Sequence, residues 1–363
     1  MATDRQGGAG ASPALQPEPF GATPDGRAAR LYTLENGVLR VGISDFGGRM
    51  VRIEAPDRNG QRADVLLGFD DVRTYATAGG AFGALLGRNA NRIAGARLAI
   101  DGQEFRLSKN EGDNTLHGGA VGFDKVFWTV AAVEAGPTPR LVLTHVSADG
   151  DQGFPGEVSV TATYRLAEDS LWLEFAAETS KPTVISLSAH PYFNLAGAAS
   201  GDVLGHEVTL AADAFLPTGR SQIPTGQIRP VEGTVFDFRK PCVLGSRIRQ
   251  ADEQLFYGLG YDQCFVLNAG ASDGPRLAAR VRDPLSGRVL EVHTDQPSLQ
   301  LYTGNKLNGA IAGHGGVIYR QSAGFALEAQ GFPDAPHHAN FPSTILRPGE
   351  GYRRVIRYRF CAT

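Results

Sequence analysis

The stretch "EVSVTATYRL", residues 157–166, alternates apolar and polar side chains along its whole length. A period of two is typical of a β-strand, because neighbouring side chains of a strand point to opposite faces of its sheet. One face of this strand should lie against a hydrophobic core and the other should be polar. The apolar face consists of Val158, Val160, Ala162, Tyr164 and Leu166.

The same alternation recurs along the chain and sets the fold class. It is found in "SLWLEFAAE" (170–178), "RVLEVHT" (288–294), "SLQLYTG" (298–304), "FALEAQ" (325–330) and "RRVIRYRF" (353–360). The 46 glycines and 21 prolines separate such runs, whereas helical periodicity is scarce. We expect one short helical turn within residues 63–76 and one true helix within residues 246–255. Many short strands joined by turns favour an all-β sandwich.

The chain of 363 residues is long enough for one large domain or two ordinary ones. No charged or serine-rich linker divides it and no repeat of fixed period is visible, so we expect a single β domain over residues 19–363. Residues 1–18 are rich in Gly, Ala and Pro and contain neither a basic leader nor an apolar segment. They predict a flexible tail and no secretory signal.

The composition excludes several classes of protein. The formal net charge is −3, from 35 basic and 38 acidic residues, and no basic run suggests a nucleic-acid or membrane-surface partner. No apolar stretch approaches the roughly 20 residues of a membrane helix. The three cysteines, Cys242, Cys264 and Cys361, show no CxxC spacing. We therefore expect no disulfide framework, no cysteine zinc site and a cytoplasmic protein.

Three of the predicted strands carry polar or small residues on their second face. In "TVISLSAHPYF", residues 183–193, the apolar side chains alternate with Ser186, Ser188 and His190. The other two strands contribute Gln300, Tyr302, Glu328 and Gln330 in the same way. A sheet with one packed face and one polar face is a candidate platform for a polar ligand.

A single polar residue in one of these strands is weak evidence for a functional site, because a lone histidine in a strand is usually structural. Other polar residues add to the case: His117 in "NTLHGG" (114–119), Asn91 and Arg92 in "GRNANRIAG" (87–95), and Asp262 in "YDQCF" (261–265). Arg92 could equally belong to a structural ion pair, and Asp262 could cap a turn.

Longer blocks of sequence connect these residues to a family. The blocks are "GRNANRI", "NTLHGG", "GFDKVFW", "GFPGEVSVTATY", "HPYFNLAG", "YDQCF", "QLYTGN" and "LEAQGFPDAPHHANFPSTILRPGEGY". Together and in this order, from about Phe20 to the C-terminus, they resemble the aldose 1-epimerase family, also called galactose mutarotases. The resemblance implies a large antiparallel β-sandwich of the galactose mutarotase-like supersandwich type. It also implies interconversion of the α and β anomers of free aldoses such as glucose and galactose, with no cofactor and no metal.

The resemblance further implies a role for each polar residue. Glu328 would be the general base and His190 the general acid, with Arg92, His117, Asp262 and Gln300 holding the sugar and Asn91 supporting them. Opening a pyranose hemiacetal needs a base for the anomeric hydroxyl and an acid for the ring oxygen. We expect the carboxyl and the imidazole at opposite ends of one monosaccharide-sized pocket. Nearby buried carboxylates should hold the proton on His190.

Some features leave alternatives open. "EGDN", residues 111–114, stands where "NGPN" is more common in the family, and could tune the preferred hydroxyl pattern. Among the aromatic residues Trp128, Trp172, Tyr192 and Phe193, we expect at most one to stack on a sugar and the others to be core. The runner-up function is a non-catalytic sugar-binding or sensing protein on the same fold, and a pentose or sugar phosphate could replace the hexose. The expected partner is a monosaccharide bound by a monomer or homodimer.

Overall fold

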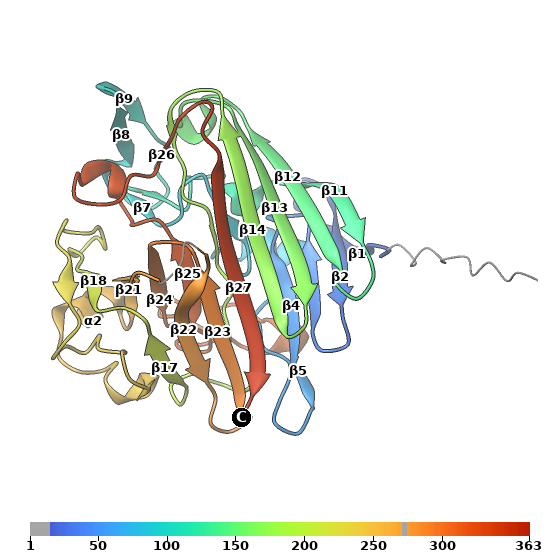
Figure 1. The fold of residues 1–363 in the computed structure, drawn as a ribbon. Helices are drawn as coiled ribbons and strands as arrows, with labels where there is room; N and C mark the ends of the chain where they lie inside the picture. The colour runs from blue at the N-terminus through green and yellow to red at the C-terminus, as the bar shows by residue number, and fades with distance from the viewer. Residues whose placement is uncertain (1–14, 271–273) are drawn as a thin grey trace, which may run out of the picture.

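A long, twisted antiparallel sheet runs through the molecule (Figure 1). The computed structural model describes residues 15–270 and 274–363. The sheet contains, in spatial order, β11 (Thr129–Glu134), β12 (Arg140–Ser147), β13 (Val158–Ala167), β14 (Ser170–Thr179), β27 (Tyr352–Ala362), β23 (Arg288–Thr294), β22 (Arg276–Arg282), β17 (Glu207–Leu210) and β20 (Cys242–Val243). The alternation of residues 157–166 is confirmed, because the five apolar side chains of this stretch are buried in β13.

Two five-stranded sheets pack against the long sheet. The first is formed by β1 (Glu18–Ala22), β2 (Ala28–Glu35), β3 (Arg40–Ser44), β4 (Met50–Pro56) and β5 (Arg62–Asp64). The second has the order β19 (Arg229–Pro230), β18 (Ala214–Leu216), β21 (Asp262–Val266), β24 (Ser298–Tyr302) and β25 (Ala326–Gln330). One hydrophobic cluster joins all three sheets, for example through Val41, Leu173 and Leu299. This arrangement is the expected all-β sandwich.

Short elements complete the fold. Four pairs of short strands are β6 (Leu85–Leu86) with β16 (Ser188–Ala189), β7 (Arg92–Ile93) with β10 (Thr115–Leu116), β8 (Arg97–Ile100) with β9 (Gln103–Arg106), and β15 (Thr183–Val184) with β26 (Ile345–Leu346). The helices are α1 (Val72–Thr77) and α2 (Glu253–Gly258), and the 3₁₀ turns are Ala94–Ala96, Phe123–Lys125, Asp151–Gly153, Leu244–Ser246, His314–Gly316 and Ala335–His337.

The two helix predictions had different outcomes. The helical turn expected within residues 63–76 is confirmed in position by α1. The helix expected over residues 246–255 is wrong in extent, because α2 begins only at Glu253. Asp252 caps it by accepting a hydrogen bond from Gln254 N at 2.8 Å, and its own backbone is extended. Within the part of the chain described here, no helix is long and apolar enough to cross a membrane.

The structure describes only part of the region around the predicted boundary between tail and domain at residue 18. Residues 1–14 of the expected tail lie outside the described residues, and Glu18 already belongs to β1. A flexible tail over residues 1–18 and a single domain over residues 19–363 therefore stay predictions.

Three adjacent strands place three of the candidate residues in neighbouring positions. In the antiparallel register Gln300 of β24 is opposite Glu328 of β25. Asp262, the first residue of β21, lies opposite Tyr302, two positions along β24 from Gln300. Because side chains two positions apart in a strand share a face, the pleat itself brings these polar groups to one side of the sheet.

His190 reaches the same place from a segment that is not one strand. The predicted strand over residues 183–193 is broken into β15 and β16 with an isolated bridge between Asn89 and Ser186. The segment pairs in turn with β26, Asn89 and β6, and therefore does not form one continuous ladder. Its second face is polar as expected, yet Ser186, Ser188 and His190 are all buried.

Candidate active site

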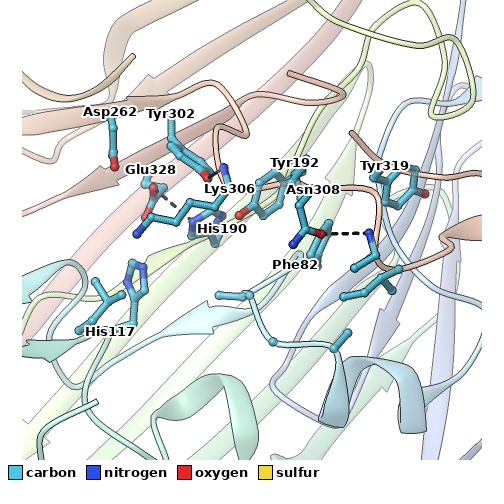
Figure 2. Close-up of a pocket in the computed structure, with 18 of the residues that line it drawn as sticks. Phe82, His117, His190, Tyr192, Asp262, Tyr302, Lys306, Asn308, Tyr319 and Glu328 are labelled. Carbon is cyan, nitrogen blue, oxygen red and sulfur yellow. Dashed lines mark hydrogen bonds and ion pairs between the residues drawn. The ribbon is translucent and has the colours of Figure 1, made fainter. Parts of the chain in front are cut away.

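One cavity of about 490 Å³ collects most of the candidate residues. Its wall includes Asn91, Arg92, His117, His190, Asp262 and Glu328, which come from five separate parts of the chain. Figure 2 shows His117, His190, Glu328 and Asp262 gathered at one end, and Phe82 and Tyr319 at the other. Gln300 is buried but does not line the cavity.

Glu328 and His190 lie side by side on one wall. Glu328 Oε1 is 3.5 Å from His190 Nε2, and the two residues are only 2% and 6% exposed. The expectation that they occupy opposite ends of the pocket is therefore wrong. β25 carries Glu328, and His190 follows β16, which packs against β25. The other atoms of the pair, Glu328 Oε2 and His190 Nδ1, have no hydrogen-bond partner among the described residues.

Burial drives this pair toward its uncharged form. It lowers the pKa of His190 from its ordinary value to about 4. It raises the pKa of Glu328 well above the ordinary range; the charge of Asp262 acts in the same direction and that of Arg92 opposes it. The expectation that nearby carboxylates hold the proton on His190 is thus wrong. The loss of water around the imidazole is the main cause, and only a backbone hydrogen bond at His190 opposes it.

His117 is held in one tautomer by the backbone beside it. The N–H of Asn91 donates to His117 Nδ1 at 3.1 Å, and the N–H of His117 donates to the Asn91 carbonyl at 3.0 Å. Both residues adopt positive φ, 63° and 50°, which this close pairing requires. Burial lowers the pKa of His117 well below its ordinary value, so the ring is neutral. Its proton therefore sits on Nε2, which becomes a hydrogen-bond donor.

The glycine after His117 lets the backbone pass close to Gly87, and the glycines of this stretch suggested such a close approach from the sequence. Gly118 has a φ of 91°, and a Cβ at that position would lie 1.9 Å from the carbonyl oxygen of Gly87. No other residue type fits a left-handed backbone in such close contact with another chain segment.

The same residues form a set that could be mistaken for a metal centre. Ligand atoms of His117, His190 and Glu328 all lie within 4.8 Å of one another. A metal-binding histidine, however, normally donates its second ring N–H to an acceptor. His117 instead accepts from the Asn91 N–H at Nδ1, and His190 Nδ1 has no partner among the described residues. The donor set is therefore suited to hydrogen bonding rather than to metal coordination.

Arg92 belongs both to an ion pair and to the pocket wall. Its Nε and Nη2 donate to the two carboxylate oxygens of Glu111 at 2.5 and 2.8 Å, and Nη2 also donates to Gln222 Oε1 at 3.0 Å. Arg92 is therefore in an ion pair, and its role in holding a sugar stays a prediction. Nη1 has no hydrogen-bond partner within the described residues, so it keeps two N–H groups for a ligand.

Asp262 accepts one amide hydrogen bond on each carboxylate oxygen. Gln300 Nε2 donates to Oδ1 at 2.7 Å, and Gln222 Nε2 donates to Oδ2 at 2.6 Å. Asp262 therefore does not cap a turn. Gln300 lies behind Asp262 and restrains its carboxylate through this hydrogen bond, and a direct contact of Gln300 with a sugar stays a prediction.

Several residues of the site were not found from the sequence. Glu111 was noted only because "EGDN" departs from the family pattern. Gln222 and Lys306 gave no signal, since each lies in a loop without periodicity. Lys306 Nζ lies 3.4 Å from Glu111 Oε1. In Figure 2 the Lys306 side chain extends across the pocket toward His117 and Glu328.

The aromatic residues mostly follow expectation. Tyr192 stacks on His190, with ring centroids 4.7 Å apart and an angle of 26° between the planes, and it lines the cavity. Trp128 and Phe193 are buried in the core, as predicted. Trp172 is not core, because it lies on the outer face of β14 between the guanidinium groups of Arg165 and Arg357.

Comparisons with known proteins show the family of the chain. The sequence model of the family described as Aldose 1-epimerase matches residues 30–359. The chain is 42% identical to the human protein named galactose mutarotase, over 94% of this chain and 97% of that one. It is 38% identical to the aldose 1-epimerase of Escherichia coli K12, over 93% and 97% of the two chains.

Solved structures give the same result for the fold. A GalM/aldose epimerase homologue from C. elegans superposes with a TM-score of 0.85 and 29% identity, covering 93% of this chain and 100% of that one. A galactose 1-epimerase from Lactobacillus acidophilus superposes with a TM-score of 0.82 and 26% identity, covering 96% and 99%. The fold is thus shared with these proteins over nearly their whole length.

Proposed function

Because the chain belongs to the aldose 1-epimerase family and interconverts the α and β anomers of aldoses, we propose that Glu328 and His190 carry out the two proton transfers of the reaction. The observation that carries this proposal is the buried pair itself, with Glu328 Oε1 and His190 Nε2 3.5 Å apart on the cavity wall. A protein that only bound sugar would not need an acid and a base in contact.

The close spacing suits the bond that has to break. The anomeric hydroxyl oxygen and the ring oxygen are bonded to the same carbon, so an acid and a base must reach two neighbouring atoms rather than two distant ones. Glu328 as carboxylate takes the anomeric proton while His190 as imidazolium donates to the ring oxygen. The aldehyde then rotates about its C1–C2 bond and exposes its other face. Reclosure reverses both transfers, so the pair ends with the proton that it began with.

Burial of the pair favours its protonation state in the ring-opened intermediate. Ring opening leaves Glu328 protonated and His190 neutral, which is the form that burial stabilises. The closed sugar reacts from the other form, in which the single proton has moved from Glu328 to His190. Burial therefore favours the protonation state of the pair in the ring-opened intermediate, and the same preference makes the charged form that starts the reaction less populated in the resting enzyme.

Three other residues hold the sugar in this proposal. The Nε2–H of His117 and the free N–H groups of Arg92 Nη1 donate to sugar oxygens, where they stabilise developing negative charge. Asp262 accepts from sugar hydroxyls with the lone pairs that its amide partners leave free. Gln300 and Asn91 act indirectly, since Gln300 fixes Asp262 and Asn91 fixes His117.

The substrate in this proposal is a free monosaccharide, and D-galactose or D-glucose is the first to test. Relatives at 38–43% identity carry the names galactose mutarotase and aldose 1-epimerase. Lys306 adds a second cation beside Arg92, so a sugar phosphate belongs in the test panel with xylose and arabinose. The three free cysteines fit a reducing compartment such as the cytoplasm, where we expect a monomer or homodimer.

Polarimetry tests the proposal. Freshly dissolved α-D-galactose should reach its equilibrium rotation much faster with the protein than without it. Glu328→Gln and His190→Asn should each lower kcat by about 10²- to 10⁴-fold, with sugar binding retained. Glu174→Gln and His293→Asn, which change the same residue types on the long sheet, should behave like wild type. Near-normal turnover in Glu328→Gln would show that the base lies elsewhere.

A further inference from the structure

We propose that Gln222 is a positioning residue for the reaction, whose side-chain amide ties Arg92 to Asp262 and so decides which edge of each faces the sugar. This inference rests on the proposed function and adds to it a residue on a separate loop. Gln222 does not line the cavity and lies behind two residues that do.

The orientation of the Gln222 amide is determined by its neighbours. Its Oε1 accepts from Arg92 Nη2 at 3.0 Å, and its Nε2 donates to Asp262 Oδ2 at 2.6 Å. A guanidinium can only donate and a carboxylate can only accept, so the amide fits in one orientation alone. Both partners carry charge, which makes these hydrogen bonds stronger than neutral ones.

The hydrogen bonds to Gln222 and Glu111 leave Arg92 one free edge. A guanidinium has five N–H groups. Glu111 takes Nε–H and one N–H of Nη2, and Gln222 takes the second N–H of Nη2. Without Gln222 the guanidinium could pivot about its bidentate pair with Glu111. With it, Nη1 is the edge that remains for a sugar oxygen.

Asp262 is restrained in the same way from two sides. Gln300 holds Oδ1 at 2.7 Å and Gln222 holds Oδ2 at 2.6 Å, so the carboxylate plane cannot rotate without breaking a hydrogen bond. Gln222 is thus the one described residue that bonds to both of these sugar-holding groups. The distance between the Arg92 donor and the Asp262 acceptor depends on the Gln222 amide. The arrangement of sugar hydroxyls that fits best depends on this distance.

The loop that carries Gln222 is built to hold it. Gln222 has a φ of 57°, and its N–H donates to the Gly219 carbonyl within the hairpin turn between Thr218 and Pro224. The buried Gln254 of α2 clamps the start of the turn, accepting from Thr218 N at 2.7 Å and donating to Thr218 O at 2.9 Å. An exposed glutamine on an unsupported loop would not show this bracing.

Gln222→Met tests the proposal, because it keeps the length of the side chain and removes both hydrogen bonds. We expect kcat/KM for D-galactose to fall about tenfold or more and the ratio of galactose to glucose rates to change. The melting temperature should stay close to that of wild type, since Gln254 still holds the loop. Ser221→Ala, on the same turn and exposed, is the matched control and should leave rates unchanged.

Gln222→Glu supplies a readout that a merely structural role would not give. At about pH 8 its carboxylate would keep the contact with Arg92 but would replace the donor to Asp262 Oδ2 with a like charge, so activity should be low. Once protonated, the new carboxyl has one donor and one acceptor, as the amide does. The ratio of variant to wild-type kcat/KM should therefore rise as the pH falls to about 5.

Two results would overturn the proposal: a Gln222→Met enzyme with wild-type rates and sugar preference, or a Gln222→Glu ratio that does not change with pH. Both are measured against wild-type turnover. They therefore differ from a failure of the proposed function, in which the wild type itself would not accelerate mutarotation.

Discussion

The imidazole of His190 and the carboxyl of Glu328 form a buried pair, 3.5 Å apart, although they come from segments far apart in the sequence. Tyr192 covers one face of the imidazole, and the cavity opens beside the pair. Such a pair titrates as a unit, because a proton lost by one partner can be taken up by the other.

The pH dependence of kcat/KM in the free enzyme should be bell-shaped with a displaced acid limb. The active pair holds one proton. As the pH falls through the lowered pKa of His190, about 4, the pair gains a second proton and loses its base. As the pH rises through the raised pKa of Glu328, the pair loses its only proton and its acid. The acid limb should therefore lie near pH 4. An acid limb at the ordinary imidazole pKa of about 6.5 would contradict this account.

Glu328→Gln should change the dependence of stability on pH. The folded-state pKa of Glu328 is raised, so its contribution to stability is fully present below the ordinary pKa and is lost as the pH rises through the folded value. Glutamine does not titrate. The melting temperature of the variant relative to wild type should therefore increase with pH, by a few degrees. Calorimetry at several pH values measures this difference, and a pH-independent difference would show that Glu328 is not strained by burial.

Glu111→Gln should weaken the binding end of the pocket. Glu111 holds the Arg92 guanidinium at 2.5 and 2.8 Å and lies 3.4 Å from Lys306 Nζ. An uncharged amide keeps the shape but loses the bidentate charge pairing, so KM should rise several-fold while kcat falls less. Glu350→Gln, an exposed carboxylate away from the cavity, serves as control. An unchanged KM would mean that Arg92 is held well enough by Gln222 alone.

Chelators should leave turnover unchanged. The Asn91 N–H fixes the proton of His117 on Nε2, the atom that a metal would need to be free. Dialysis against EDTA followed by polarimetry checks this expectation. A loss of activity that added zinc or another divalent ion restored would show that His117, His190 and Glu328 act as metal ligands after all.

The long strands could be predicted from the sequence, because their alternating apolar and polar residues are alternately buried and more exposed in the structure. β13, β14 and β27 each bury alternate residues against one core, so local periodicity and tertiary packing agree. The segment before His190 behaves differently. It is buried on both faces and pairs with three partners. The predicted polar face is therefore present, but the predicted single strand is not.

The candidate site divides in the same way. The polar residues of the pocket wall were predictable because the family resemblance identifies them in long blocks. The spacing of Glu328 and His190, their protonation and the roles of Gln222 and Lys306 were not. These depend on how loops without periodicity approach β21, β24 and β25, and on how much water the fold excludes from the pair.

A double-mutant cycle on Glu328 and His190 tests the central claim most directly, namely that the two side chains exchange protons with the sugar as one unit. The kcat of wild type, Glu328→Gln, His190→Asn and the double variant would be measured by NMR exchange between the anomers of galactose. If the residues act together, the double variant should be no slower than the slower single variant. Losses that multiply would contradict the account, because they would mean that each residue contributes independently.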